Sequence, residues 1–369
     1  MTQTLDEISL ILIYSAMAVY ALAFIAFALD LAKRSSEVKQ QERLESGEAA
    51  GAVGAGAGTG AEVPVAAGGA VLNASSVSVP AVPARGGKAA RATVRGGSGS
   101  VGAVASGKAG AGKAGRSVPL RLGVSFTVLG FAIQVVGVVL RGIAADRVPW
   151  ANMYEFSITG TAIIVGVFLL VLLREDLRFL GTFVMGLILI LLGVATVNYY
   201  VPVSPLQPAL QSAWLVIHVL VAIIGTAFFA LGGALSIVQL LQTKGDALSR
   251  AASALRLRFL RTLPDADTLE RLAYRVTIVG FVLWTFTLIA GAIWAERAWG
   301  RYWGWDTKEV WTFIIWVIYA GYIHARATRG WRGSRSAWLA IVGFAAVLFN
   351  FGVVNVFFKG LHAYSGLGS

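Results

Sequence analysis

Apolar residues in this chain run together instead of alternating with polar ones. Runs of about 18 to 25 apolar residues recur, and a helix of that length crosses a hydrocarbon core of roughly 30 Å. A backbone in lipid has no water to bond to, so long apolar runs without a two-residue period predict helices and not a barrel. The pattern therefore predicts an all-α polytopic membrane protein. Eight spans are expected, at residues 8–29, 124–140, 156–173, 180–197, 214–240, 276–294, 310–327 and 337–357.

Charge predicts how these spans are oriented. Of the 31 Lys and Arg residues, 25 fall in the segments 33–121, 174–178, 244–275 and 326–335. Cytoplasmic loops are enriched in Lys and Arg, so these four segments are predicted to be cytoplasmic and both termini extracytoplasmic. The net charge of +12 then reflects topology. No nucleic-acid partner is predicted, because the basic residues do not gather on one folded, aromatic-bearing surface.

Composition predicts three regions. Residues 1–34 form an N-terminal membrane anchor, because acidic residues precede its apolar run and basic residues follow it, the reverse of a cleavable secretory signal. Residues 35–118 are dominated by Gly, Ala, Ser and Val, which predicts a disordered cytoplasmic linker. Its basic residues could also touch anionic membrane lipid. Residues 119–369 are predicted to be a seven-helix membrane domain.

A tryptophan-rich segment stands out in the last third of the chain. Six of the eleven tryptophans fall between residues 294 and 316, and the loop expected at about 295–310 is predicted to be external. An aromatic belt at the membrane surface would explain one or two such residues per helix end. A flat apolar platform for a large planar ligand is the alternative, and composition alone leaves both open. The platform would consist of Trp299, Tyr302, Trp303 and Trp305.

Charged residues in and beside this loop also admit two interpretations. Arg301 and Lys308 could pair with acidic substituents at the edge of a ligand. Asp306 and Glu309 stand where they would cap the next span at its N-terminus. Capping is the default role for Asp306, and orientation of Trp305 or of a ligand is the alternative. The chain has no cysteine, so any thiol chemistry must come from a partner or a substrate.

The three histidines favour the ligand interpretation. His218 lies just inside the fifth span and His362 follows the last span, which predicts both on the side of the tryptophan loop. Two neutral imidazoles on opposite faces of one planar macrocycle are the arrangement of haem axial ligands. His324 lies roughly 20 Å deeper, and an ionisable residue inside a span predicts a second site. Its opposite ligand would come from another subunit or a small molecule; a snorkelling residue beside Arg326 is the alternative.

Together these residues resemble the WWD-domain haem-handling family, and within it the CcsA/ResC subunits of the System II cytochrome c synthase. The resemblance covers about residues 122–369. It is most specific in the sequence Trp-Gly-Arg-Tyr-Trp-Gly-Trp-Asp-Thr-Lys-Glu at 299–309 and in the segments that end at His218, His324 and His362. Two departures concern the fine geometry of the loop and tail. Thr307 stands where the family commonly has proline, and Ala363 where it commonly has serine.

The resemblance implies a role for each candidate residue. His218 and His362 would be the external axial ligands of haem b, and His324 would pair with a histidine of a ResB/CcsB-type membrane partner. The loop would bind the face of the haem. Its implied contacts are Trp299, Tyr302, Trp303, Trp305 and Asp306.

The activity implied by the resemblance is that of a haem lyase, or holocytochrome c synthase, subunit. Haem would cross the membrane and be joined to the thiols of a Cys-x-x-Cys-His segment of apocytochrome c, with thiol-reducing proteins as further partners. This chain supplies no nucleophile, so it would act by positioning. A bacterial plasma membrane is expected, with a plastid thylakoid membrane as the alternative. The rival functions are a System I-type haem carrier or exporter, a secondary transporter with histidine proton relays, and a structural anchor.

Overall fold

A computed structural model describes the protein. It describes residues 2–55, 117–204, 211–249, 260, 262–328, 330–358 and 360–362. Contacts within the chain divide it into two units, Met1–Arg43 with Arg116–Ser369, and Leu44–Gly115. Only the end of the first helix is described in the second unit, so the predicted linker lies mostly outside the described residues. All of the contacts below belong to the first unit.

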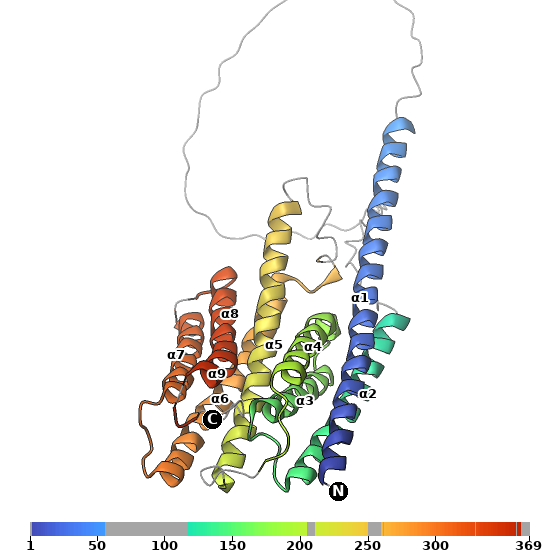
Figure 1. Ribbon diagram of the computed structural model, residues 1–369. Helices are drawn as coiled ribbons and strands as arrows, with labels where there is room; N and C mark the ends of the chain where they lie inside the picture. Colours follow the sequence, from blue (N-terminus) through green and yellow to red (C-terminus); the bar gives the residue numbers. More distant parts are fainter. Residues whose placement is uncertain are drawn as a thin grey trace, which may run out of the picture. The chain divides into compact units, whose positions relative to one another are not determined.

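Every regular element in the described part of the chain is helical, which confirms the predicted all-α fold (Figure 1). The helices are α1 (Thr2–Ala55), α2 (Val118–Ala145), α3 (Met153–Leu172), α4 (Gly181–Asn198), α5 (Ala213–Ser249), α6 (Ala266–Trp299), α7 (Thr307–Thr328), α8 (Ser334–Phe349) and α9 (Asn355–Phe357). A short 3₁₀ turn, Arg178–Leu180, precedes α4, and a π-helical turn, Asn350–Val354, joins α8 to α9.

Seven of the described helices are long and apolar enough to cross a membrane, in accord with a polytopic membrane protein. They include α1 to α6 and the continuous segment Ser334–Phe357. The predicted span at 310–327 corresponds to α7, which is not among the seven. With 22 residues α7 is about 33 Å long, so length does not exclude it. Its composition keeps α7 out of this set, because two Trp, two Tyr and His324 interrupt the apolar sequence.

The first helix is longer than the predicted anchor. α1 continues to Ala55, beyond the boundary expected at residue 34, so residues 35–55, which were predicted to be disordered, are helical. The physical reason is local composition, because residues 36–50 are rich in Glu, Gln, Ala, Lys and Arg, which favour a helix even without an apolar face.

A row of glycines on α2 lets α1 pack closely against it. Gly123, Gly130 and Gly137 recur every seven residues, and a Cβ on each would lie 2.9, 2.7 and 3.1 Å from Phe27, Tyr20 and Ile13 respectively. Those three large residues are also seven apart and run in the opposite order, as expected for antiparallel helices. Small residues at such positions allow the close backbone approach that drives helix association in lipid.

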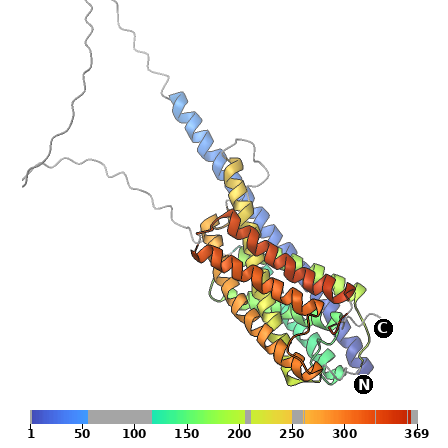
Figure 2. The same cartoon turned by 90° about the vertical axis from the view of Figure 1, so that its left-hand side faces the viewer.

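Helix α5 is the central element of the membrane domain. It contacts α3, α4, α6 and α8, while α7 packs against α6 and α8. Figure 2 shows α7 and α8 lying side by side along the bundle. We call the end of the bundle that carries residues 300–306 the loop end, and the opposite end the far end. The start of α1 and the last described residue, His362, both lie at the loop end, as Asp6 and His362 contact residues there.

A buried glutamate closes the far end. Glu270 of α6 accepts hydrogen bonds from the Gly333 amide (2.7 Å) and the Ser336 hydroxyl (3.2 Å), both at the start of α8. It also forms an ion pair with Arg326 near the end of α7 (3.4 Å). This one carboxylate therefore fixes the turn between α7 and α8 against α6.

Candidate functional site

His218 projects from the second turn of α5 toward α6. Its Nδ1 lies 2.9 Å from the backbone oxygen of Thr287, and its ring stacks on Trp294 with centroids 5.9 Å apart. A Cβ on Gly291 would lie 2.7 Å from the imidazole, so α6 can approach the ring this closely only with glycine there. A carbonyl only accepts, so Nδ1 carries the proton and Nε2 of the neutral ring keeps a lone pair. Nε2 is therefore the atom available to a metal.

His362 is also held through its Nδ1 atom, here by the side chain of Asp306. Its Nδ1 lies 2.7 Å from Oδ2 of Asp306, while Oδ1 of Asp306 accepts the Leu361 amide (3.0 Å). The hydrogen bond with His362 is the main cause that holds the pKa of Asp306 below its usual value, so this carboxylate stays ionised. An ionised carboxylate at Nδ1 again leaves the Nε2 lone pair for a metal, the arrangement common behind histidine ligands.

Trp294 lies against both histidines. Besides stacking on His218, it meets His362 edge-on at 5.5 Å. Trp299 completes the group, with its ring 4.9 Å from His362 and 4.7 Å from Trp294. Residues from α5, α6 and the C-terminal tail, far apart in the sequence, thus meet at the loop end.

His218, His362 and Trp294 line one cavity. Its walls come from α3 to α8, and its volume is about 180 Å³, or about 1400 Å³ when the adjoining open solvent is included. On α6 the lining extends from Trp294 to Trp284, ten residues or about 15 Å toward the middle of the bundle. The lining is mostly apolar, with a few polar side chains, as is typical of sites for large organic ligands.

The tryptophan loop is fixed by reciprocal capping of α7. Glu309 accepts the amides of Gly304 (2.8 Å) and Asp306 (3.0 Å), while Asp306 accepts the amide of Lys308 (3.3 Å). This is a capping box, which ties the loop to the first turn of the helix. Trp305 has a positive φ of 61°, a rare backbone conformation for a side-chain-bearing residue. Asp306 thus both caps α7, as the sequence suggested, and orients His362.

The four aromatic residues of the predicted platform occupy two different places. Trp299 packs inward beside His362. Tyr302, Trp303 and Trp305 are 63%, 36% and 77% exposed, and the rings of Trp303 and Trp305 are nearly perpendicular at 5.8 Å. Trp303 also meets Phe313 of α7 edge-on at 6.3 Å. They do not form one flat surface, and none of the four lines the cavity. Any role of the three exposed rings lies on the outside of the bundle.

His324 lies far from the other two histidines. It is 17 residues after the start of α7, or about 25 Å along that helix. Its side chain is exposed on the bundle surface, and its backbone oxygen accepts a hydrogen bond from the Thr328 hydroxyl (2.7 Å). A ligand at His324 would therefore be reached from outside the chain.

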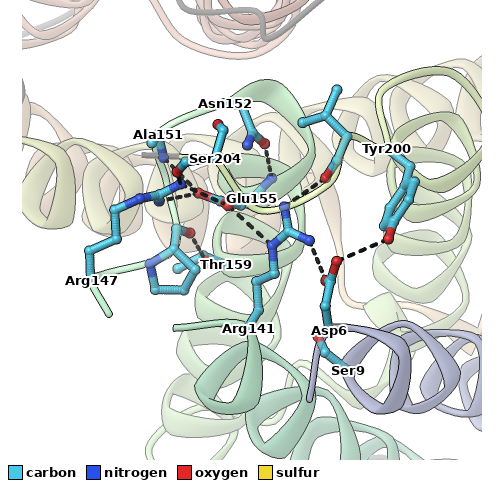
Figure 3. A network of polar contacts seen from close by, with 12 residues as sticks. Asp6, Ser9, Arg141, Arg147, Ala151, Asn152, Glu155, Thr159, Tyr200 and Ser204 are labelled. Atoms are coloured by element: carbon cyan, nitrogen blue, oxygen red, sulfur yellow. Dashed lines mark hydrogen bonds and ion pairs between the residues drawn. The ribbon is translucent and has the colours of Figure 1, made fainter. Parts of the chain in front are cut away.

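Sequence reasoning missed a buried charge network at the loop end (Figure 3). Arg141 of α2 lies between Asp6 of α1 and Glu155 of α3, with its Nε 3.1 Å from Glu155. Arg147 pairs with the other oxygen of Glu155 at 2.6 Å, and Tyr200 donates to Asp6 at 3.1 Å. Opposite charges at the ends of neighbouring predicted spans were the available signal, because charges in a membrane protein are usually paired.

This network supports the wall of the cavity. The same oxygen of Glu155 that pairs with Arg147 accepts the amide of Ala151 (3.0 Å), and Asn152 caps α3 through the amide of Glu155 (2.9 Å). Trp150, Ala151, Asn152 and Met153 form one side of the cavity. Glu155 is thus a positioning residue for that side of the cavity.

A family profile described as "Cytochrome C assembly protein" matches residues 150–362, more than half of the chain. The chain belongs to this family. The matched region begins at the α2–α3 turn and ends at His362, so it contains the whole cavity lining described above.

Proteins with the name cytochrome c biogenesis protein CcsA are among the relatives, which confirms the resemblance found in the sequence. That of Parasynechococcus marenigrum is 39% identical over 178 residues, 44% of this chain and 58% of that protein. That of Synechococcus elongatus is 40% identical over 197 residues, 44% of this chain and 61% of that protein. That of Guillardia theta is 34% identical over 259 residues, 67% of this chain and 86% of that protein. The chain therefore covers about three-fifths of the length of the first two of these relatives.

Proposed function

We propose that this chain acts in cytochrome c assembly by binding haem b at the loop end and presenting it for attachment to apocytochrome c. The observation that carries the proposal is that His218 and His362 line one cavity and are both anchored through Nδ1, which leaves two Nε2 lone pairs. Such a pair suits the two axial positions of haem iron.

The donor set fits haem better than a bare metal ion. Among the described residues no three His, Cys, Asp or Glu side chains cluster in a way that could hold a metal. Two imidazoles alone leave a free ion incompletely coordinated, whereas haem brings four nitrogens of its own. The indole faces and aliphatic walls of the cavity then provide the apolar contacts that a macrocycle requires.

The chemistry of attachment is addition of two thiols to two vinyl groups. In each addition a sulfur–carbon bond forms at the vinyl carbon next to the macrocycle, and the thiol proton passes to the terminal carbon. No electrons are gained or lost, so the step needs no oxidant. This chain contributes by holding the iron and the ring while a Cys-x-x-Cys-His segment approaches, which is catalysis by positioning.

His324 belongs to the same proposal as a second haem site toward the cytoplasmic side. Its exposed position supports ligation in which the opposite imidazole comes from a ResB/CcsB-type membrane subunit. Haem would move from this site to the loop end, which faces the extracytoplasmic side in a bacterial plasma membrane or a thylakoid membrane. Thiol-reducing proteins would keep the two substrate cysteines reduced.

The test is an absorption spectrum of the purified protein, expressed with its partner subunit. Wild-type protein is expected to carry haem with the spectrum of iron between two imidazoles. His218→Ala and His362→Ala should each lose that spectrum and regain it with added imidazole, because the free ligand fills the vacated position. Unchanged spectra in both variants would contradict the proposal.

A second measurement separates this function from that of a haem carrier. The chain and its partner subunit are expressed with an apocytochrome in cells that lack other cytochrome c assembly factors. Covalently attached haem, detected in the cytochrome after denaturing electrophoresis, is expected if the pair carries out attachment. Haem-loaded protein without any mature cytochrome would instead indicate a carrier.

A further inference from the structure

The cavity lined by the two histidines also contains a lysine side chain. Among its described lining residues Lys308 is the only lysine or arginine, and none is a carboxylate. An otherwise apolar cavity with one cation and no anion favours a ligand that brings its own negative charge, because burial of an unpaired charge is costly.

The neighbouring acids do not neutralise Lys308 by ion pairing. Asp306 is hydrogen bonded to His362, and Glu309 faces Arg301 at 3.5 Å. Lys308 Nζ instead donates to the side-chain oxygen of Asn355 on α9. The Asn355 amide nitrogen in turn lies 3.4 Å from the sulfur of Met153, another lining residue. The ammonium group of Lys308 thus lies on the cavity wall next to a neutral amide.

The π-helical turn places a second amide on the same wall. Asn350 is the first residue of the π-helical turn and Asn355 follows its last residue, and both line the cavity. Asn350 is buried, yet its side-chain oxygen has no hydrogen-bond partner among the described residues. Buried polar atoms are normally satisfied, and π-helical turns are frequent at functional sites. Asn350 therefore points to a ligand group that completes its hydrogen bonds.

We propose that Lys308, Asn355 and Asn350 form a carboxylate subsite that receives the propionate groups of the haem held by His218 and His362. This inference rests on the proposed function and adds the orientation of the ligand. The two propionates leave one edge of haem together, so their attachment to this wall blocks rotation of the ring in its own plane. The vinyl-bearing part of the ring is thereby kept away from Lys308 and available to incoming thiols.

The test compares haem with haem dimethyl ester, in which both carboxylates are neutral but the iron and ring are unchanged. Each is titrated into the purified complex with its partner subunit, and the bis-imidazole absorption reports binding. Wild-type protein is expected to bind haem on the order of tenfold more tightly than the ester, as for loss of a charge-assisted hydrogen bond. Lys308→Gln should reduce haem affinity to that of the ester and leave ester affinity unchanged.

Two variants serve as controls. Lys308→Arg keeps the charge and should retain most of the preference for haem over the ester. Arg275→Gln removes an exposed cation that pairs with Glu175 at the far end, and it should change neither affinity. A lipid carboxylate is the other source of the same chemistry, so each titration is repeated with excess oleate.

The outcomes distinguish the subsite from the proposed function. If wild-type protein binds neither haem nor ester with two imidazoles, the proposed function fails and the subsite fails with it. If wild-type protein binds both equally, or Lys308→Gln weakens both equally, haem binding stands and the subsite is overturned. If excess oleate abolishes the preference of wild-type protein for haem and leaves the haem affinity of Lys308→Gln unchanged, a lipid carboxylate is the occupant and the propionate assignment is overturned.

Discussion

The two candidate ligands differ in the group that anchors them. They could be chosen as candidates from the sequence, because only three histidines exist and two are predicted on the side of the tryptophan loop. Their anchors could be predicted only in part. Asp306 stands in a recognisable motif, whereas the acceptor for His218 is the backbone oxygen of Thr287, which sequence patterns do not reveal. Trp294, which touches both imidazoles, was hidden among neighbouring tryptophans.

Gly291 offers a test of His218 that leaves the histidine in place. In Gly291→Ala the new Cβ would meet the imidazole at 2.7 Å, so the ring must turn away from Thr287. The stability of α6 itself should increase, because alanine is about 1 kcal/mol more favourable than glycine in a helix. We expect haem affinity to fall about tenfold, the low end for loss of an outer-shell partner. A haem titration with and without imidazole measures the effect.

Gly321→Ala is the matched control. Gly321 lies on α7, and a Cβ there would have no neighbour within 4 Å. It should leave haem affinity unchanged and leave stability equal or slightly higher. Equal haem affinity in Gly291→Ala and wild-type protein would show that the orientation of His218 by α6 is unimportant.

The apolar runs predicted where the helices lie in the sequence, but not which helices pack against one another. Seven of the predicted spans each correspond to one long helix, and the span at 337–357 covers α8, the π-helical turn and α9. Gly123, Gly130 and Gly137 could have suggested how α1 meets α2, because a seven-residue repeat of small residues is visible in the sequence. The contacts of α5 with four other helices could not be deduced, since apolar faces in lipid carry little information about which helix they meet.

The link between α2 and α3 depends on Glu155. In Glu155→Gln the buried guanidinium groups of Arg141 and Arg147 lose their shared carboxylate. Removal of one partner from a buried ion pair typically costs about 3 to 5 kcal/mol. We therefore expect a clearly lower thermal unfolding temperature in detergent, together with weaker haem binding, because the Ala151 amide loses its acceptor at the cavity wall.

The comparison variant is Glu175→Gln at the far end. Glu175 pairs with the largely exposed Arg275 at 2.6 Å, and surface pairs contribute about 0 to 1 kcal/mol. Its unfolding temperature should stay near that of wild-type protein. Equal stability of the two variants would mean that the loop-end network does not hold the helices together.

For the whole molecule, the sidedness of the bundle is still a prediction from charge. The absence of cysteine allows it to be tested with single introduced cysteines. Thr4 and Ser204 are exposed at the loop end, and Asp176 is exposed at the far end. In intact cells a membrane-impermeant maleimide should label Thr4→Cys and Ser204→Cys, whereas Asp176→Cys should react only after permeabilisation. The opposite pattern would invert the topology and place the two outer histidines in the cytoplasm.

The overall fold class followed from the sequence because the bilayer leaves few choices for a long apolar chain. Eight spans were predicted, whereas seven of the described helices are long and apolar enough to cross a membrane. The difference is α7, in which aromatic residues that pack between α6 and α8 take the place of aliphatic ones. The cavity itself could not be foreseen. It depends on side chains from six helices, and no local pattern in Gly160, Thr226 or Phe344 indicates that they face a common space.

Under the proposed function, the different supports of the two imidazoles have a consequence for how a finished cytochrome leaves. His218 belongs to a 37-residue helix at the centre of the bundle, whereas His362 follows the short helix α9 and depends on the single carboxylate of Asp306. His218 is therefore held in a fixed position, whereas His362 can move with the C-terminal tail. Movement of His362 disturbs no membrane-spanning helix. We therefore expect the histidine of a matured cytochrome to displace His362 from the iron first and His218 last.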